Sequence, residues 1–135
     1  MRIVKSIDLV TEPKLKDNQW YIYVIRNRPQ SNIKIGRTKD PKQRFSSLSG
    51  SNSGGNNLDI FAISEPTYVY FLERMAHDHF ARERIPNTEW FSGDDISFLE
   101  VVDYLEKIFN TESYKRTNER VKSYLYLLNK DLEES

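Results

Sequence analysis

The sequence of 135 residues contains no cysteine, which excludes disulfide bonds and thiolate metal sites. No apolar run approaches the roughly 18 residues that span a bilayer, and no secretory signal opens the chain. We therefore expect an intracellular, cytoplasmic protein with no membrane partner. Internal repeats are also missing, and the length suits about one domain with one hydrophobic core.

The charges balance overall but are unevenly distributed along the chain. Residues 1–57 hold 11 Lys/Arg against 4 Asp/Glu, and residues 58–135 hold 9 against 16. The basic excess is densest between positions 26 and 44, where the cations are Arg26, Arg28, Lys34, Arg37, Lys39, Lys42 and Arg44. Such a patch can bind phosphates, although a solvated surface explains the charge equally well. The charge pattern therefore permits nucleic-acid binding without establishing it.

The pattern of apolar residues predicts three strands and four helices. Residues 20–26 and 33–36 have strand composition and form a predicted hairpin, and residues 58–64 are predicted to be a strand covered on both faces. The predicted helices begin at Pro41, at Pro66-Thr67, after Asp94-Asp95 and at Glu112. This order predicts an α/β (α+β) domain in which helices flank a small three-stranded antiparallel sheet.

We expect an N-terminal extension over residues 1–19, a folded domain over residues 20–109 and a C-terminal helix over residues 110–135. One face of the last helix carries a recurring apolar stripe, formed by Val121, Leu125, Leu128 and Leu132. That stripe either closes the core or pairs two chains into a homodimer. The Ser/Gly/Asn-rich stretch at residues 46–57 is typical of a connecting loop.

Strand alternation places side chains of the predicted hairpin on two faces. Ile22 and Val24 share one face of the first strand, and Ile33 and Ile35 share one face of the second. If both pairs cover the same core, the side chains on the other face include Tyr23 and Lys34. A solvated sheet face and a polar functional site are equally compatible with this pattern.

Four short motifs follow one another at informative spacings. They are YIYVI at residues 21–25, IKIGRTKDPKQR at 33–44, Glu73 with His77, and EWF at 89–91. Together they resemble the GIY-YIG endonuclease family, and most closely the small branch carried by phages and large DNA viruses. The likeness covers about residues 20–105.

The resemblance implies a GIY-YIG nuclease-like fold and hydrolysis of DNA phosphodiester bonds with one divalent metal ion, Mg²⁺ or Mn²⁺. In this sequence Tyr21 stands in place of the glycine of GIY, and Lys34 in place of the first tyrosine of YIG. The second substitution changes a group that takes part in the chemistry of the family. A catalytically inactive nucleic-acid-binding module is therefore an alternative, as is a protein-interaction domain that uses the C-terminal helix.

The resemblance implies five catalytic positions: Tyr23, Lys34, Arg44, Glu73 and His77. Bringing the pKa of a phenol from about 10 to near 7 needs about 4 kcal/mol of preferential phenolate stabilisation. We expect the Lys34 ammonium to supply it, so that Tyr23 accepts a proton from the attacking water. Arg44 is expected to bind phosphate with its planar guanidinium, and Glu73 to ligate the metal. His77, four residues after Glu73, is expected to orient that carboxylate or to contact DNA, and an ordinary surface pair with Glu73 is the alternative.

Two further groups complete the predicted site. The expected DNA contacts are Arg26, Arg37, Lys39, Lys42 and Asn52. The expected supporting positions beside the catalytic residues are Tyr21, Gly36 and Glu89.

Overall fold

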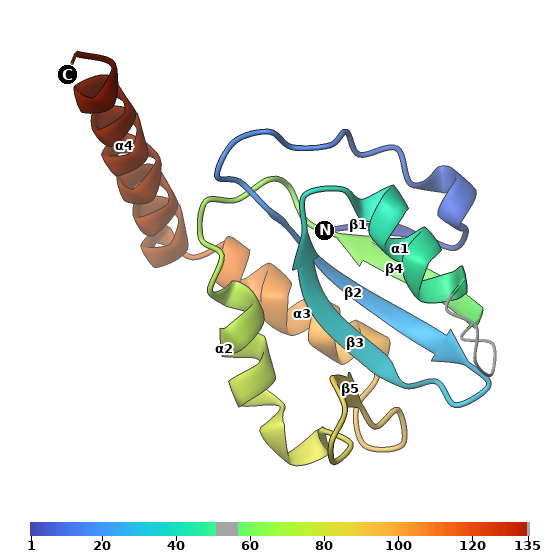
Figure 1. Cartoon of the computed structure of the whole chain (residues 1–135). Coiled ribbons are helices and arrows are strands. Elements are labelled where there is room, and N and C mark those ends of the chain that lie inside the picture. Colours follow the sequence, from blue (N-terminus) through green and yellow to red (C-terminus); the bar gives the residue numbers. More distant parts are fainter. Residues whose placement is uncertain (51–56, 135) are drawn as a thin grey trace.

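The computed structural model describes residues 1–50 and 57–134, so Asn52 and its expected DNA contact lie outside the described residues. Figure 1 shows a sheet with helices on both faces and a last helix that extends away from the body. The strands are β1 (Arg2–Val4), β2 (Tyr21–Arg28), β3 (Ile33–Thr38), β4 (Asn57–Ile63) and β5 (Trp90–Phe91). The α-helices are α1 (Pro41–Gly50), α2 (Leu72–His79), α3 (Phe98–Phe109) and α4 (Glu112–Glu134). Short 3₁₀ turns occupy Ile7–Leu9 and Ala81–Glu83.

The sheet is antiparallel and has the strand order β1-β4-β2-β3-β5. The α+β class and the hairpin of β2 with β3 are confirmed, but the expected number of three strands is wrong. The two additional strands are edge strands of three and two residues. Segments this short contain too few residues to show alternation, so tertiary pairing alone defines them. β1 also attaches the N-terminal residues to the sheet, beside β4.

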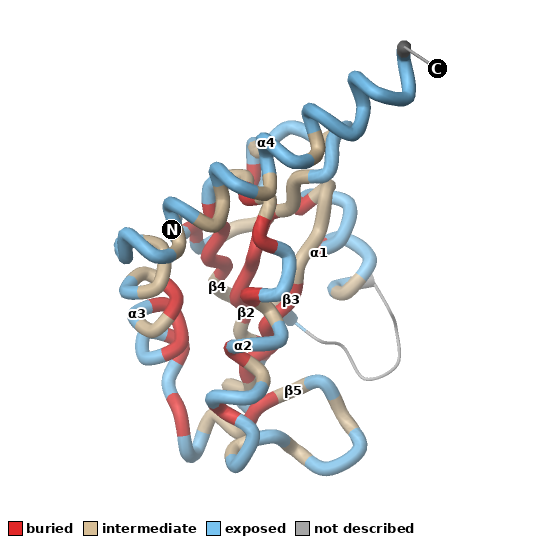
Figure 2. The backbone as a smooth tube through the Cα atoms, turned by 90° about the vertical axis from the view of Figure 1, so that its left-hand side faces the viewer, coloured by how far each residue is buried: buried red, intermediate tan, exposed pale blue. Residues whose placement is uncertain are grey.

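β2 lies in the middle of the sheet and is covered on both faces. All five side chains from Tyr21 to Ile25 are buried, and the buried parts of the chain concentrate around the sheet and α3 (Figure 2). On one face, Ile22 and Val24 join Ile33 and Ile35 in a core completed by α2 and α3. The predicted sharing of one core face by these four residues is confirmed.

The opposite face forms a second core. Tyr23 packs edge-on against Phe45 of α1, with ring centroids 5.2 Å apart, and Phe45 packs against Phe61 of β4 at 4.9 Å. Val10 of the N-terminal segment is buried in the same cluster. Tyr23 and Lys34 do share this face, since Tyr23 pairs with Gly36 and Ile25 with Lys34 across the hairpin. The face is covered by α1 and the N-terminal segment rather than by solvent.

α1 begins at Pro41, as the sequence predicts, and Asp40 caps it by accepting a hydrogen bond from the Gln43 N–H at 3.2 Å. α2 is shorter than predicted and begins at Leu72 instead of Pro66. Trp20 and Thr67 exchange two backbone hydrogen bonds of 2.8 and 2.9 Å, which form an isolated β-bridge and keep Thr67 out of the helix. A bridge formed by residues far apart in the sequence therefore overrides the local helical pattern.

The last two helices are anchored by specific hydrogen bonds. Ser97 and Glu100 form a capping box at the start of α3. On α4, the Tyr114 hydroxyl bonds to Thr67 Oγ1 at 2.6 Å, and Asn118 Oδ1 accepts from the Tyr68 N–H at 2.8 Å. Beyond these contacts α4 is largely exposed (Figure 2). No helix in the described part of the chain is long and apolar enough to cross a membrane.

Candidate active site

The outer edge of β3 is the structural element on which the site is built. On the outer side of β3, β5 pairs with Ile33 and Lys34 only, so within the described residues the following part of β3 has a neighbouring strand, β2, on its inner side alone. α2 lies beside this part, and its His77 Nε2 contacts the Ile35 carbonyl oxygen at 2.7 Å. Because a carbonyl only accepts, Nε2 carries the hydrogen and donates it. His77 thereby attaches α2 to the strand edge and satisfies a backbone acceptor.

Gly36 provides the space that the Tyr23 phenol occupies. The two residues lie opposite each other on β3 and β2. A Cβ at position 36 would overlap with Oη, Cζ and Cε2 of the Tyr23 ring. The absent side chain thus lets the phenol lie directly against β3. The resemblance placed Gly36 beside the catalytic residues without giving a physical reason. The structure supplies one, because the missing side chain leaves room for the Tyr23 ring.

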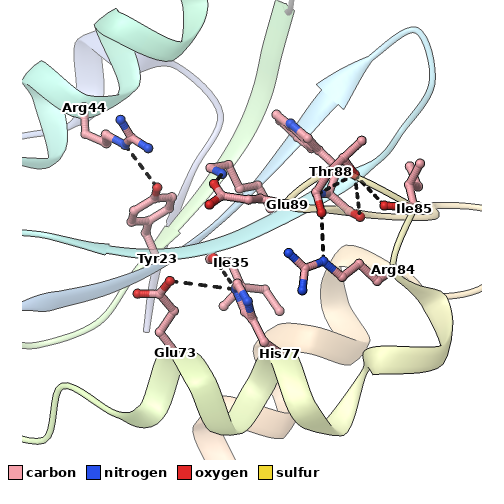
Figure 3. Close-up of polar contacts among 11 residues, drawn as sticks. Tyr23, Ile35, Arg44, Glu73, His77, Arg84, Ile85, Thr88 and Glu89 are labelled. Atoms are coloured by element: carbon pink, nitrogen blue, oxygen red, sulfur yellow. Dashed lines mark hydrogen bonds and ion pairs between the residues drawn. The ribbon is translucent and has the colours of Figure 1, made fainter.

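Arg44 of α1 donates a hydrogen bond from Nε to the Tyr23 hydroxyl at 3.3 Å (Figure 3). Burial nevertheless raises the pKa of Tyr23 above its usual value, because it outweighs the lowering effects of Arg44, and the charges of Glu73 and Glu89 raise it further. The expectation that Lys34 brings this pKa towards 7 is therefore wrong. The cation bonded to the hydroxyl is Arg44, and the phenol stays protonated at neutral pH.

Glu73 lies in the first turn of α2 and points from that helix towards the sheet (Figure 3). Its carboxylate is 3.7 Å from Arg37 Nε and 3.9 Å from His77 Nε2, both longer than hydrogen bonds. The side chain retains 29% of its accessible surface. Its charge raises the pKa values of both Tyr23 and Arg44, so the three groups lie within electrostatic range of one another.

Lys34 is buried, and its ammonium is bonded to Glu89 Oε2 at 2.5 Å. This bond lowers the pKa of Glu89, an effect to which Arg44 and His77 also contribute. The ammonium also lies 5.9 Å from the centre of the Trp90 ring. Lys34 therefore attaches to the sheet the segment in which Glu89 lies. The carboxylate of Glu89 is mostly exposed and lies within electrostatic range of Arg44 and His77.

The loop before Glu89 is held by its own hydrogen bonds. Arg84 Nε donates to the Thr88 carbonyl at 2.8 Å, and Thr88 Oγ1 bonds to the Ile85 carbonyl at 2.8 Å (Figure 3). Asn87 adopts a positive φ of 63° at the turn. These contacts fix the conformation of the loop and therefore the position of Glu89.

The expected DNA-contacting cations are not gathered in one place. Arg26 forms a two-bond ion pair with Asp59, at 3.1 and 2.8 Å, and its position on β2 alternates away from Tyr23. Lys39 donates to backbone carbonyls of Asp17 and Gln19. Lys42 is exposed on α1, whereas Arg37 lies beside Glu73. Tyr21, expected in a supporting position, uses its hydroxyl to hold the N-terminal segment through a 2.8 Å bond to the Pro13 carbonyl.

The described residues contain no cluster of three or more His, Asp or Glu side chains that could hold a metal ion. A single carboxylate with waters and substrate phosphate is nevertheless a common Mg²⁺ arrangement. Glu73 fits this requirement, because its carboxylate is partly exposed and no close hydrogen bond to Arg37 or His77 engages it.

An aromatic group that the sequence did not predict lies next to Glu73. The guanidinium of Arg37 lies 4.6 Å from the centre of the Trp20 ring and 5.0 Å from that of Tyr70. Tyr70 falls in the segment that was predicted to be helical, and Trp20 precedes the strand. Nothing in the sequence around Trp20 or around Tyr70 indicates that the two rings lie near the same guanidinium. His79, at the end of α2, is exposed and stacks on Tyr104, with ring centroids 4.2 Å apart.

Residues 20–122 match the T5orf172 domain, and the chain belongs to this family. The T5orf172 domain is phage-associated and nuclease-related. Searches of curated proteins and of solved structures return no match. The family covers β2 to the middle of α4 and so includes every element that contributes to the site.

Proposed function

We propose that the chain is a metal-dependent DNA endonuclease of the GIY-YIG type, with its reaction centre at the open edge of β3. The observation that carries the proposal is the meeting of three groups from three elements. The Tyr23 hydroxyl lies against Gly36, is bonded to Arg44, and is within electrostatic reach of Glu73. The nuclease-related family supports a reaction on DNA.

In this proposal Tyr23 acts as a neutral hydroxyl. Arg44 Nε donates to Oη, so the hydrogen of the phenol is available for an oxygen of the substrate phosphate. The paired terminal nitrogens of Arg44 match two phosphate oxygens and neutralise charge that develops during the reaction. Arg37, beside Glu73, holds a neighbouring phosphate.

Glu73 would hold one Mg²⁺ or Mn²⁺ ion through its carboxylate, together with waters and substrate oxygens. Such an ion, when bound, lowers the pKa of a coordinated water and stabilises the leaving oxygen. His77 positions α2 through the Ile35 carbonyl and does not accept a proton through Nε2. Lys34 and Glu89 hold the EWF segment beside the reaction centre.

The test is nicking of supercoiled plasmid with Mg²⁺ and with EDTA. We expect Tyr23→Phe, Arg44→Lys and Glu73→Gln each to lower the rate at least about 100-fold, because each removes a group that acts on the transition state. Asp78→Asn on α2 and Arg82→Lys are matched controls, since both side chains are exposed and are not placed in the site. If the Glu73→Gln variant nicks plasmid at the wild-type rate, the proposal is refuted.

A DNA-binding module without catalysis is the second candidate. One observation favours it: the position of the first YIG tyrosine holds Lys34, whose ammonium is bonded to Glu89. Binding of DNA without any metal-dependent nicking, at protein concentrations well above the Kd, identifies this alternative.

A further inference from the structure

Two adjoining cavities lie between α4, the segment of residues 16–20 and the strand edge that carries Arg37. The first, of about 370 Å³, is lined by Trp20, Arg37, Tyr70 and residues of α4. The second, of about 380 Å³, is lined by Lys16, Lys122 and Tyr126, among others. Because Asn18, Tyr68 and Leu125 line both, the two cavities adjoin, and we call them together the α4 groove.

One end of the α4 groove reaches the candidate active site. Arg37 lines the first cavity, and its Nε is 3.7 Å from the Glu73 carboxylate. From there the groove runs along α4 towards Lys122 and Asn129. A strand of nucleic acid whose phosphate lies at Glu73 and Arg44 therefore has a path away from the site that follows α4.

The lining combines aromatic rings with positive charge. Trp20 and Tyr70 enclose the Arg37 guanidinium, and Tyr68 and Tyr126 line the groove further along. Its described lining carries three cations, Lys16, Arg37 and Lys122, and one anion, Asp17. Stacking rings for bases and ammonium or guanidinium groups for phosphates are the combination that binds single-stranded nucleic acid.

We propose that the α4 groove binds a single-stranded nucleic-acid segment, whose bases stack on its aromatic side chains next to the candidate cleavage site. A base pair presents only its edges to a protein, whereas the aromatic faces in the groove need an unstacked base. The place of the groove as an exit from the cleavage site rests on the proposed function; the binding itself does not. The substrate class is then DNA with an unpaired segment beside the scissile bond.

α4 completes the groove. The base of the helix is held by the bonds of Tyr114 and Asn118, and the following turn supplies Val121 and Leu125 to the groove. Half-buried Val121 and Leu125 thus form a wall of the groove.

The test is fluorescence anisotropy in EDTA, with labelled oligo-dT of about 15 nucleotides and a duplex of the same length. We expect the wild type to bind the single strand more tightly. Tyr70→Ala removes an exposed ring and should weaken single-strand binding about five- to 150-fold, whereas Tyr70→Phe keeps the ring and should bind normally. Tyr124→Ala is the matched control, because Tyr124 is similarly exposed but does not line the groove.

A second pair of variants tests the charge. Lys122→Ala should lower the slope of log K against log salt by about 0.7, the value for one phosphate contact to a single strand. Lys130→Ala, on the same helix but outside the described lining, should leave the slope unchanged. An oligo-U probe distinguishes RNA from DNA as the preferred strand, and free dTMP shows whether one base suffices.

The outcomes separate this proposal from the nuclease proposal. If single-strand binding depends on Tyr70 but the protein does not nick DNA, the groove proposal is supported and the nuclease proposal is refuted. Equal binding by Tyr70→Ala and Tyr124→Ala overturns the groove, whatever the cleavage assay shows. If the chain also sediments as a dimer that Leu125→Asp dissociates, the groove faces a second copy and the proposal is wrong.

Discussion

Replacing Gly36 with alanine tests whether the space at this residue holds Tyr23 in position. The new methyl group would approach the ring more closely than 3.0 Å, and the two residues are paired directly across the hairpin. Overpacking of this kind costs about 1–3 kcal/mol. With about 2.1 cal/mol/K of unfolding entropy per residue, 135 residues give about 0.28 kcal/mol/K, so about 2 kcal/mol lowers Tm by about 7 °C.

The decisive assay is a double-mutant cycle measured by chemical denaturation. Tyr23→Ala alone should cost about 3–5 kcal/mol through the cavity that it leaves. In that background the alanine at position 36 meets no ring, so its cost should disappear and the coupling energy should equal about 1–3 kcal/mol. If Gly36→Ala costs the same in both backgrounds, the steric reasoning is refuted. Gly36→Ala should also slow nicking in the proposed nuclease, because the phenol is displaced from Arg44.

Hydrogen bonds at Glu89, Asn118 and Ser97 each contribute a measurable part of the stability. Glu89→Gln should cost about 1 kcal/mol near pH 7, less than a fully buried pair, because Glu89 is exposed even though Lys34 is not. Lys34 lowers the pKa of Glu89 in the folded protein. The stabilisation from this pair is therefore complete above pH 4.5, the usual pKa of a glutamate, and is lost as the pH falls through the lowered pKa of Glu89. Wild-type and variant Tm curves between about pH 3 and 7 should therefore converge in acid; parallel curves contradict the pairing. Asn118→Ala removes the acceptor for the Tyr68 N–H and should cost about 1–3 kcal/mol, with faster hydrogen exchange along α4 as its signature. Ser97→Ala removes the capping box of α3 and should lower Tm by about 3–4 °C, equivalent to about 1 kcal/mol, and an unchanged Tm counts against the cap.

The hairpin and the starts of α1 and α4 could be predicted from the sequence because their signals are local. Alternating apolar residues and a proline after an aspartate act over a few positions, and no distant contact opposes them. The late start of α2 could not be predicted, because the bridge that precedes it joins Thr67 to the distant Trp20. The two edge strands were missed for the same reason.

The candidate site shows the same division between local and distant information. Alternation correctly put Tyr23 and Lys34 on one face, but which cation meets the phenol depends on the placement of α1. The raised pKa of Tyr23 results from burial beneath Phe45 and the N-terminal segment, which strand alternation does not describe. The pairing of Lys34 with Glu89 joins residues 55 positions apart and likewise has no local signal.

The way the sheet ends on each side bears on solubility. On one side, β5 and His77 of α2 cover the rim of β3, and on the other the last strand is only three residues long. Arg2 within that short strand is ion-paired with Glu12, which places charge at the rim. Neither border, within the described residues, offers a long flat template for a strand from another molecule. The architecture thus guards against fibrous aggregation at both borders of the sheet.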